Sequence, residues 1–353
     1  MSFTELIKEL PQVGMDWHRE TLLENTRRNF PNGESTIRAI RSDPRKCLII
    51  SAGPSLYRQR SLDKIQDYAG VIVATDGAYI QCLKHHIVPD YVLTIDPHPT
   101  RIVRWFGDLD YHANNDGYFE RQDLDISFRE NPEKVNQENI KLVDDHPVPL
   151  VIACSAPENV VARTQNIDRF WFVPLVDDPE GIICKCGHDE NAHDDYEFNP
   201  HECHQCSCQQ FLEEESLTRQ MMKLTGYRDN RLGLPAMNTG GTVGNCAWVF
   251  AHSILQSKDI ACIGMDFAYY MDTPLEQTQS WNMLKDKGEI DKYYPREMTI
   301  WGEFYTDPTY FWYRQNLLDL LENGDGYITN ATEGGLLYGS RVKTARLTQW
   351  LKS

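Results

Sequence analysis

The chain has 353 residues, of which 41% are hydrophobic and 25% are charged, as in ordinary globular proteins. This length is large for one compact core, so we expect two lobes or a core with insertions. The formal net charge of −17, from 35 basic and 52 acidic residues, argues against a broad surface that tracks nucleic-acid phosphates. A local basic pocket stays compatible with it.

No stretch approaches the roughly 20 apolar residues that a membrane-spanning helix needs. The first 12 residues carry Glu5, Lys8 and Glu9 within their apolar pattern, unlike a secretory signal. We therefore expect a cytoplasmic location, no membrane and no nucleic acid among the partners. The oligomeric state stays open.

Residues 1–45 are polar and have a helical pattern, which predicts an N-terminal lid or packing element. Short apolar runs then cover residues 46–56, 70–75 and 90–95, and segments long enough for helices separate them. This alternation predicts βαβ units and a parallel sheet. Residues 104–146 are polar and predict an excursion from the sheet, which resumes at 148–154 and 169–175. The first part of the core thus covers residues 46–177.

A cysteine-rich insertion, residues 178–214, separates this part from a second one, residues 215–353. There we expect a buried helix at 240–255, a strand at 259–264 and an irregular aromatic segment at 269–313. An amphipathic helix at 313–322, a strand at 326–330 and a terminal helix at 344–351 follow. The fold class is therefore α/β, a Rossmann-like, mostly parallel sheet flanked by helices, with a small inserted zinc-knuckle module.

A glycine turn follows the first predicted strand. Gly53, Pro54 and Ser55 stand where a doubly wound sheet places its phosphate-binding loop. Gly53 permits close backbone approach, and a helix that begins near Ser55 points free N–H groups at an anion. Ser55 caps that helix or donates to a phosphate. Such a turn is also common as a simple connection between a strand and a helix, without any ligand.

Three aspartates follow predicted strands directly. Asp76, Asp96 and Asp266 all fall at the carboxyl ends, where open α/β sheets bind ligands. The carboxylates of Asp76 and Asp96 suit a ribose, a sugar hydroxyl or a metal bound to phosphates. The alternative for either of these two is to cap the following helix.

Six motifs in order resemble a known family. They are Gly53-Pro-Ser-Leu56, Ala74-Thr-Asp-Gly-Ala78, Ile87-Val-Pro-Asp-Tyr-Val-Leu-Thr-Ile-Asp-Pro97, Asn238-Thr-Gly-Gly-Thr-Val-Gly244, Ile263-Gly-Met-Asp-Phe-Ala-Tyr269 and Asn330-Ala-Thr-Glu-Gly-Gly335. Together they resemble the flagellar motility accessory factors, which are related to archaeal 6-hydroxymethylpterin pyrophosphokinase-like (MptE-like) proteins. The resemblance runs from about residue 46 to about residue 340.

The resemblance implies two chemistries on a core similar to that of bacterial sialyltransferases. One is a glycosyltransferase that moves a nonulosonic acid from a CMP-activated donor to an acceptor. The other transfers pyrophosphate from ATP, with magnesium, to a pterin-like alcohol. The pterin enzymes carry Asp-Leu-Asp-Gly after the third strand, whereas this chain reads Thr94-Ile-Asp-Pro-His-Pro99. The single aspartate favours a glycosyltransferase, and a non-catalytic nucleotide-binding protein is a third alternative.

By the same resemblance, Gly53, Pro54, Ser55, Asp76 and Asp96 face the nucleotide, with Asp266 beside them. A second anion-binding helix start comprises Thr239, Gly240, Gly241 and Thr242. The catalytic candidates are Asp96, His98 and Glu333. His98 is otherwise a surface histidine, and Glu333 otherwise caps a helix or pairs with Arg341. The acceptor, a small molecule or a protein, is expected near the aromatic residues 301–313.

The insertion concentrates soft metal ligands: Cys184, Cys186, His188, His193, Cys203, Cys206 and Cys208. Thiolates and imidazoles suit tetrahedral zinc, and Cys203 with Cys206 has the usual C-x-x-C spacing. Cys184 or Cys186, with His188 or His193, completes four ligands, and a second zinc or disulfides are alternatives. Full ligation predicts a structural zinc, whose binding supplies on the order of 10 kcal/mol for folding.

Overall fold

The computed structural model describes residues 2–29, 35–65, 67–111, 131–178, 182–184, 213–226 and 233–353. Its centre is a nine-stranded sheet with the strand order β14-β13-β9-β1-β2-β3-β4-β5-β8, and all neighbouring strands in it are parallel. The α/β fold is thereby confirmed. The strands are β1 (Cys47–Ile50), β2 (Val71–Thr75), β3 (Tyr91–Thr94), β4 (Leu150–Ala153), β5 (Arg169–Leu175), β8 (Ala236–Asn238), β9 (Ile260–Ile263), β13 (Ile328–Asn330) and β14 (Val342–Thr344).

Both faces of this sheet are buried. In β1, Leu48 and Ile50 belong to one hydrophobic cluster, whereas Cys47 and Ile49 belong to another on the opposite face. Side chains of a strand point alternately to the two faces. A strand covered on both sides therefore carries an unbroken apolar run rather than an alternating one, which is why the sequence pattern locates the central strands well.

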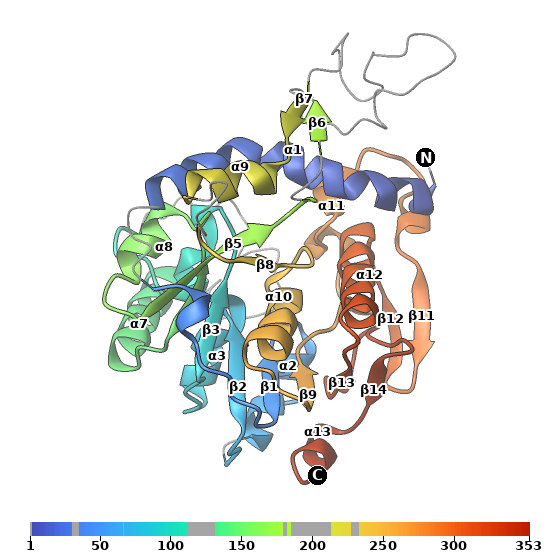
Figure 1. The fold of residues 1–353 in the computed structure, drawn as a ribbon. Helices are drawn as coiled ribbons and strands as arrows, with labels where there is room; N and C mark the ends of the chain where they lie inside the picture. The colour runs from blue at the N-terminus through green and yellow to red at the C-terminus, as the bar shows by residue number, and fades with distance from the viewer. Residues whose placement is uncertain are drawn as a thin grey trace, which may run out of the picture.

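Helices cover both faces of the sheet (Figure 1). On one face, α10 packs on β1, β2 and β3 and also contacts α12. On the other face, α3 packs on β2 and β3 and contacts α4 and α7. The helices are α1 (Phe3–Asn29), α2 (Ser55–Arg58), α3 (Asp76–Lys84), α4 (Ile102–Trp105), α7 (Pro132–Asp145), α8 (Glu158–Arg163), α9 (Leu217–Leu224), α10 (Val243–Val249), α11 (Trp281–Leu284), α12 (Pro308–Asn323) and α13 (Leu347–Trp350).

The N-terminal helix α1 is a packing element of the core. It runs across one side of the molecule, with α9 beside it (Figure 1). Its buried Asn25 donates to the carbonyl oxygens of Pro97 at 3.0 Å and Ser155 at 2.9 Å. Asn29 donates to Cys154 at 2.9 Å and to Ala156. These carbonyl groups belong to the loops after β3 and β4, so α1 is anchored at the carboxyl edge of the sheet.

The aromatic segment is more regular than the sequence pattern indicates. Instead of an irregular stretch, it contains an antiparallel sheet of β10 (Tyr269–Tyr270), β12 (Gly302–Tyr305) and β11 (Arg296–Thr299). Its tyrosines form a separate core with α1 and α11. The irregular interpretation was wrong because these aromatic side chains pack on one another rather than on the main sheet. That cluster comprises Leu6, Tyr269, Leu284, Tyr293, Tyr294 and Tyr305.

The end of the chain also differs from the prediction. Residues 342–344 form the edge strand β14, and the terminal helix α13 has only four residues. The polar excursion contains the 14-residue helix α7, whose Asn139 donates to the carbonyl group of Val103. Among the described residues, no helix is long and apolar enough to cross a membrane.

The ends of the cysteine-rich insertion lie side by side. The strands β6 (Ile182–Cys184) and β7 (Glu213–Glu215) are antiparallel, and Cys184 pairs with Glu213. The other predicted ligands, Cys186, His188, His193, Cys203, Cys206 and Cys208, lie outside the described residues. The zinc module therefore stays a prediction.

Candidate functional site

The order of the strands reverses between β1 and β9. From β1 the chain proceeds through β2, β3, β4 and β5 to one side, whereas β9 returns to the other side of β1 and is followed by β13 and β14. In doubly wound sheets, ligands bind outside the carboxyl ends of the strands at such a reversal. The predicted site residues after β1, β2, β3 and β9 all lie on this edge.

The glycine turn after β1 is closed by the chain itself. Gly53 donates its N–H to the carbonyl oxygen of Gly264 at 2.8 Å. Ser55 donates its N–H and its hydroxyl to the Asp266 carboxylate, at 3.3 and 2.8 Å. A Cβ atom at position 53 would overlap that carboxylate. The close approach that requires glycine here is therefore that of Asp266, and the N–H groups expected to be free for a phosphate are already used.

Asp266 is 3% exposed, and burial raises the pKa of its carboxyl group to about 7, with the Ser55 hydroxyl partly offsetting this. A carboxyl group in a dry site favours its neutral form because the charged form loses its hydration. Near neutral pH, Asp266 therefore holds the turn with a carboxyl group that is close to half protonated. The Asp266 carboxyl group thus lies where the sequence pattern predicts the phosphate group of a ligand.

Asp76 is the first residue of α3. Its Oδ1 atom accepts the N–H of Gly77 at 2.7 Å, so the predicted helix-capping alternative is partly observed. The side chain is nevertheless only 3% exposed, and burial raises the pKa of its carboxyl group to about 7. The nearby charge of Asp96 raises this pKa further, whereas Arg101 lowers it.

The loop after β3 brings further ionisable groups to this point. Asp96 accepts the backbone N–H of His98 at 2.9 Å, and its Oδ2 atom lies 3.4 Å from Nη1 of Arg101. Nε2 of His98 lies 2.7 Å from Nδ1 of His18, which α1 contributes. We call Asp76, Asp96, His98, Arg101 and His18 the rim cluster. It collects carboxyl, imidazole and guanidinium groups from segments far apart in the sequence.

A helix follows residues 239–242, but it begins at Val243 rather than at residue 240 as predicted, and anion binding at its start stays a prediction. Gly240 and Gly241 have φ angles of +54° and +83°, a conformation that favours glycine. The Thr242 hydroxyl accepts the N–H of Asn245 at 3.1 Å and caps α10. The helix has seven residues and continues as a π-helical turn over Phe250–Ile254.

The first turn of α10 faces the strand reversal. A Cβ atom on Gly244 would lie 3.2 Å from Oγ of Ser51, the residue directly after β1. The Ser51 hydroxyl is buried and has no hydrogen-bond partner in the part of the chain that the structure describes. Buried hydroxyls are normally satisfied, so an unsatisfied one next to a candidate site needs an explanation.

Part of the predicted acceptor segment reaches this site. Phe304 and Tyr305 are buried in core clusters, so packing explains them. A Cβ atom on Gly241 would meet Trp312 and Tyr313 of α12 at 3.2 and 3.1 Å. Burial raises the pKa of Tyr313 to about 12, and the charges of Arg101 and Asp96 also act on it. The start of α12 therefore borders the rim cluster.

Glu333 has a different neighbourhood. Its carboxylate accepts the N–H of Leu347, the first residue of α13, at 3.1 Å and lies 3.5 Å from Nζ of Lys64. The capping alternative is confirmed, but the predicted pairing with Arg341 is wrong. Arg341 pairs instead with Glu322 at 3.0 Å and Asp325 at 2.7 Å. Glu333 makes no hydrogen bond or ion pair with the rim cluster among the described residues.

The sequence pattern did not predict two members of the rim cluster. Arg101 follows the Asp-Pro-His-Pro segment by two residues, and a cation so close to a strand end was a usable signal. His18 lies on the face of α1 that also carries Leu22, Asn25 and Asn29, with spacings of four, three and four residues. That spacing marks one helix face, but no local pattern links His18 to His98.

A magnesium ion bound to phosphates typically takes one or two protein carboxylates, while the phosphates and water supply its other ligands. Asp76 and Asp96 are the carboxyl groups available for this role, since the charge of Asp96 acts on Asp76 and raises its pKa. Among the described residues, no group of three or more His, Cys, Asp or Glu side chains is placed to hold a metal ion by itself.

Residues 20–111 match the sequence profile of a family described as 6-hydroxymethylpterin diphosphokinase MptE-like. This stretch includes the glycine turn and every member of the rim cluster except His18. No curated protein matches this chain. Among solved structures, this chain is similar to the MAf glycosyltransferase from Magnetospirillum magneticum AMB-1, with 12% identity and a TM-score of 0.47. The match covers 93% of this chain but 38% of that one, and a likeness at this level says nothing of the activity of this chain.

Proposed function

We propose that this chain is a transferase that binds a nucleotide-activated donor at the rim cluster, with a CMP-activated sugar as the leading candidate. The rim cluster is the observation that carries this proposal. Arg101 offers a cation for the donor phosphate, and Asp96 offers an acceptor for a ribose or sugar hydroxyl. The strand reversal next to it, with the unsatisfied Ser51 hydroxyl, is where the fold class binds such ligands.

The proposed step breaks the bond between the sugar carbon and the donor phosphate, and forms one between that carbon and an acceptor oxygen. The phosphate leaves with the bonding electron pair as the nucleoside monophosphate, and Arg101 stabilises its charge. The acceptor hydroxyl loses its proton to a base, for which His98 is the candidate. Asp96, which holds the backbone of His98, orients this base.

Diphosphate transfer is the second candidate function, and the family description favours it. In that reaction, Asp76 and Asp96 would hold a magnesium ion together with the phosphates of ATP. The ion would neutralise charge on the transferred group. The acceptor would be a pterin-like alcohol.

A thermal-shift series with CMP, UDP, GDP, ADP and ATP, each with and without Mg²⁺, tests both functions. A ligand at about 100 times its Kd adds roughly 2.7 kcal/mol to the free energy of unfolding, which raises the Tm visibly. A metal-independent shift with CMP is the expected result. A shift with ATP only when Mg²⁺ is present would replace sugar transfer with diphosphate transfer.

A matched pair of variants localises the binding. Asp96→Asn should weaken the shift, because it removes the charge that holds Arg101 at 3.4 Å. Asp272→Asn, whose carboxylate pairs with Arg58 and is 68% exposed, should keep it. Absence of a shift with every nucleotide would overturn the proposal. Tight binding without turnover of a sugar or diphosphate donor would indicate a non-catalytic nucleotide-binding protein.

Structural zinc in the insertion is a separate proposal. Its support is the ligand set of the sequence, together with the β6–β7 pairing that brings the two ends of the insertion together. We expect the purified protein to contain zinc, as measured by elemental analysis, and the double variant Cys203→Ser, Cys206→Ser to lose it. Equal zinc contents in both proteins would contradict the assignment.

A further inference from the structure

The His18–His98 contact lies outside everything that the sequence pattern predicts. His18 is held in place by α1, whose Asn25 donates to the carbonyl oxygen of Pro97 at 3.0 Å. Pro97 directly precedes His98. Asn25 lies about two helical turns after His18, so this bond fixes α1 relative to the loop that carries His98.

The two rings are arranged to share one proton. Nε2 of His98 and Nδ1 of His18 are 2.7 Å apart, and the ring centroids are 4.7 Å apart with an interplanar angle of 55°. A bond between two imidazole nitrogens needs a donor on one and an acceptor on the other. Among the described residues, neither His98 Nδ1 nor His18 Nε2 has a hydrogen-bond partner. The pair therefore fixes one nitrogen of each ring and leaves the other available.

Charges from the neighbouring elements act on this pair. Burial lowers the pKa of His18, and the charges of His98 and Arg101 lower it further, whereas Asp96 raises it. Tyr313 of α12 faces the same group of charges. The lowered pKa favours neutral His18, whose Nδ1 atom can accept the Nε2–H of His98, whereas a proton on this Nδ1 atom would break the bond between the rings.

We propose that His18 is a positioning residue, which orients His98 and fixes its tautomer so that His98 Nδ1 is the proton acceptor of the site. This inference rests on the proposed transferase function. His98 carries its proton on Nε2 and donates it to Nδ1 of His18. Its Nδ1 atom then has a free lone pair for the proton of an acceptor hydroxyl.

The proton balance of the step is complete. When the acceptor oxygen bonds to the transferred group, its proton moves to His98 Nδ1, and His98 becomes an imidazolium. The imidazolium keeps its Nε2–H bond to His18, while the Asp96 carboxylate accepts the backbone N–H of His98 at 2.9 Å. The proton then leaves to solvent. His18 itself touches no substrate.

The variants His18→Ala and His18→Gln test the proposal, with His85→Gln as the matched control. His85 lies at the end of α3 and pairs with Asp63 at 3.1 Å, outside the rim cluster. A glutamine oxygen can accept the Nε2–H of His98, so His18→Gln should restore part of what His18→Ala loses. Urea unfolding of each variant identifies any loss that comes from misfolding.

The first readout is the position of the proton on each imidazole ring, which ¹⁵N NMR determines from the shifts of the ring nitrogens and which needs no activity. In the unaltered protein, His98 should carry its proton on Nε2, with a ¹⁵N–¹⁵N coupling across the hydrogen bond to Nδ1 of His18. A proton found on Nδ1 of His98, or the absence of this coupling, would overturn the proposal.

The second readout is the rate of transfer with the nucleotide donor that the thermal-shift series identifies. His18→Ala should lower kcat about 10- to 100-fold and leave the KM for the donor unchanged, since a positioned base typically contributes 10²- to 10⁴-fold. His18→Gln should fall between His18→Ala and the unaltered protein. Equal kcat values for all three would also overturn the proposal. If the unaltered protein binds no nucleotide at all, the proposed function fails, whereas the NMR measurement of the proton position still decides the role of His18.

Discussion

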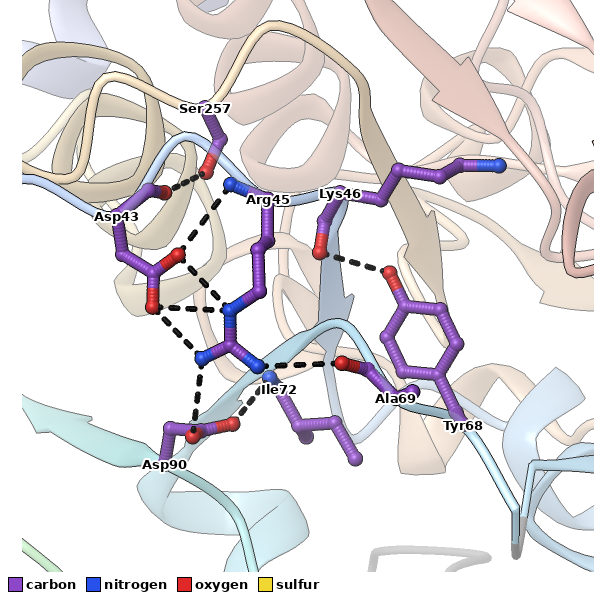
Figure 2. Close-up of polar contacts among 8 residues, drawn as sticks. All are labelled: Asp43, Arg45, Lys46, Tyr68, Ala69, Ile72, Asp90 and Ser257. Atoms are coloured by element: carbon purple, nitrogen blue, oxygen red, sulfur yellow. Dashed lines mark hydrogen bonds and ion pairs between the residues drawn. The ribbon is translucent and has the colours of Figure 1, made fainter.

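The two edges of the central sheet treat their polar groups in opposite ways. At the amino edge, partly exposed charged side chains just before the strands pair with one another (Figure 2). At the carboxyl edge, carboxyl groups and a hydroxyl are buried with few partners. The ion pairs at the amino edge hold the strands in register with little loss of free energy. The carboxyl edge instead has buried polar groups that folding alone does not require.

Arg45 is the centre of the amino edge. Its guanidinium group donates to Asp43 at 2.7–3.2 Å and to the carbonyl oxygen of Ala69 at 3.1 Å, and it lies 4.0 Å from Asp90. Asp90 in turn accepts the N–H of Ile72 at 2.7 Å. Figure 2 shows these groups pointing toward one another between the starts of β1 and β2. Hydrogen bonds to Arg45 lower the pKa of Asp43, as expected for a satisfied carboxylate.

The carboxyl edge shows the reverse. Asp76 and Asp266 are each 3% exposed, and burial raises the pKa of both to about 7. Perturbed carboxyl groups in this position are typical of functional sites. The difference between the edges therefore separates charges that ion pairs satisfy from carboxyl groups whose burial disfavours their charged form.

The largest expected effect concerns Asp76. Its folded pKa of about 7 lies above the ordinary value of 3.8, so the folded state binds its proton more tightly than the unfolded state does. Stability is then greatest below about pH 4 and falls as the pH rises to about 7. Asp76→Asn should be more stable than the unaltered protein by about 2–4 kcal/mol at pH 8 and about equal at pH 4, from roughly 1.4 kcal/mol per pKa unit.

Urea unfolding at several pH values measures this effect. Asp266, whose pKa is also about 7, should still give the variant a residual decline over the same range. Asp272→Asn is the control because its carboxylate is 68% exposed, and it should keep the full pH dependence. An unaltered slope in Asp76→Asn would show that Asp76 is not the buried acid described above.

A smaller effect is expected for Ser51, whose buried hydroxyl has no hydrogen-bond partner among the described residues. Ser51→Ala removes a polar group that folding leaves unsatisfied, so the free energy of unfolding should rise by about 1 kcal/mol. If this hydroxyl serves a ligand, the nucleotide-induced rise in Tm should decrease at the same time. Calorimetry with and without nucleotide measures both changes, and a variant that loses stability would indicate a partner for this hydroxyl.

The smallest effect is expected at the amino edge. Arg45 is 52% exposed, and exposed ion pairs contribute about 0–1 kcal/mol. Arg45→Ala should therefore lower the free energy of unfolding by less than about 1 kcal/mol, and less still at high salt. The nucleotide-induced rise in Tm should stay unchanged. A loss of nucleotide binding in this variant would remove the distinction between the two edges.

The sequence pattern reveals the central sheet because β1, β2, β3, β4 and β9 are buried on both faces and have unbroken apolar runs. It misses β8 and β14, where residues 236–238 and 342–344 carry polar or exposed side chains. It also misses the antiparallel aromatic sheet. Edge and short strands take their conformation from their neighbours, and that information is not local in the sequence.

The same limit applies to the site. The aspartates after β2, β3 and β9 follow from their place at the strand ends, and the structure places them all on the carboxyl edge. The use of Asp266 to close the glycine turn could not be predicted, since it depends on a contact across 211 residues. The pairing of His98 with His18 across 80 residues is a similar case.

The anchoring of α1 has a consequence for where this chain can be divided. The family profile begins at residue 20, in the middle of a helix that runs from Phe3 to Asn29. A shortened chain that begins there would keep the amide anchors Asn25 and Asn29 but lose Leu6, which packs in the aromatic cluster, and His18. The boundary of sequence similarity therefore does not coincide with the boundary of the folding unit, and a protein cut at the former would lack part of the latter.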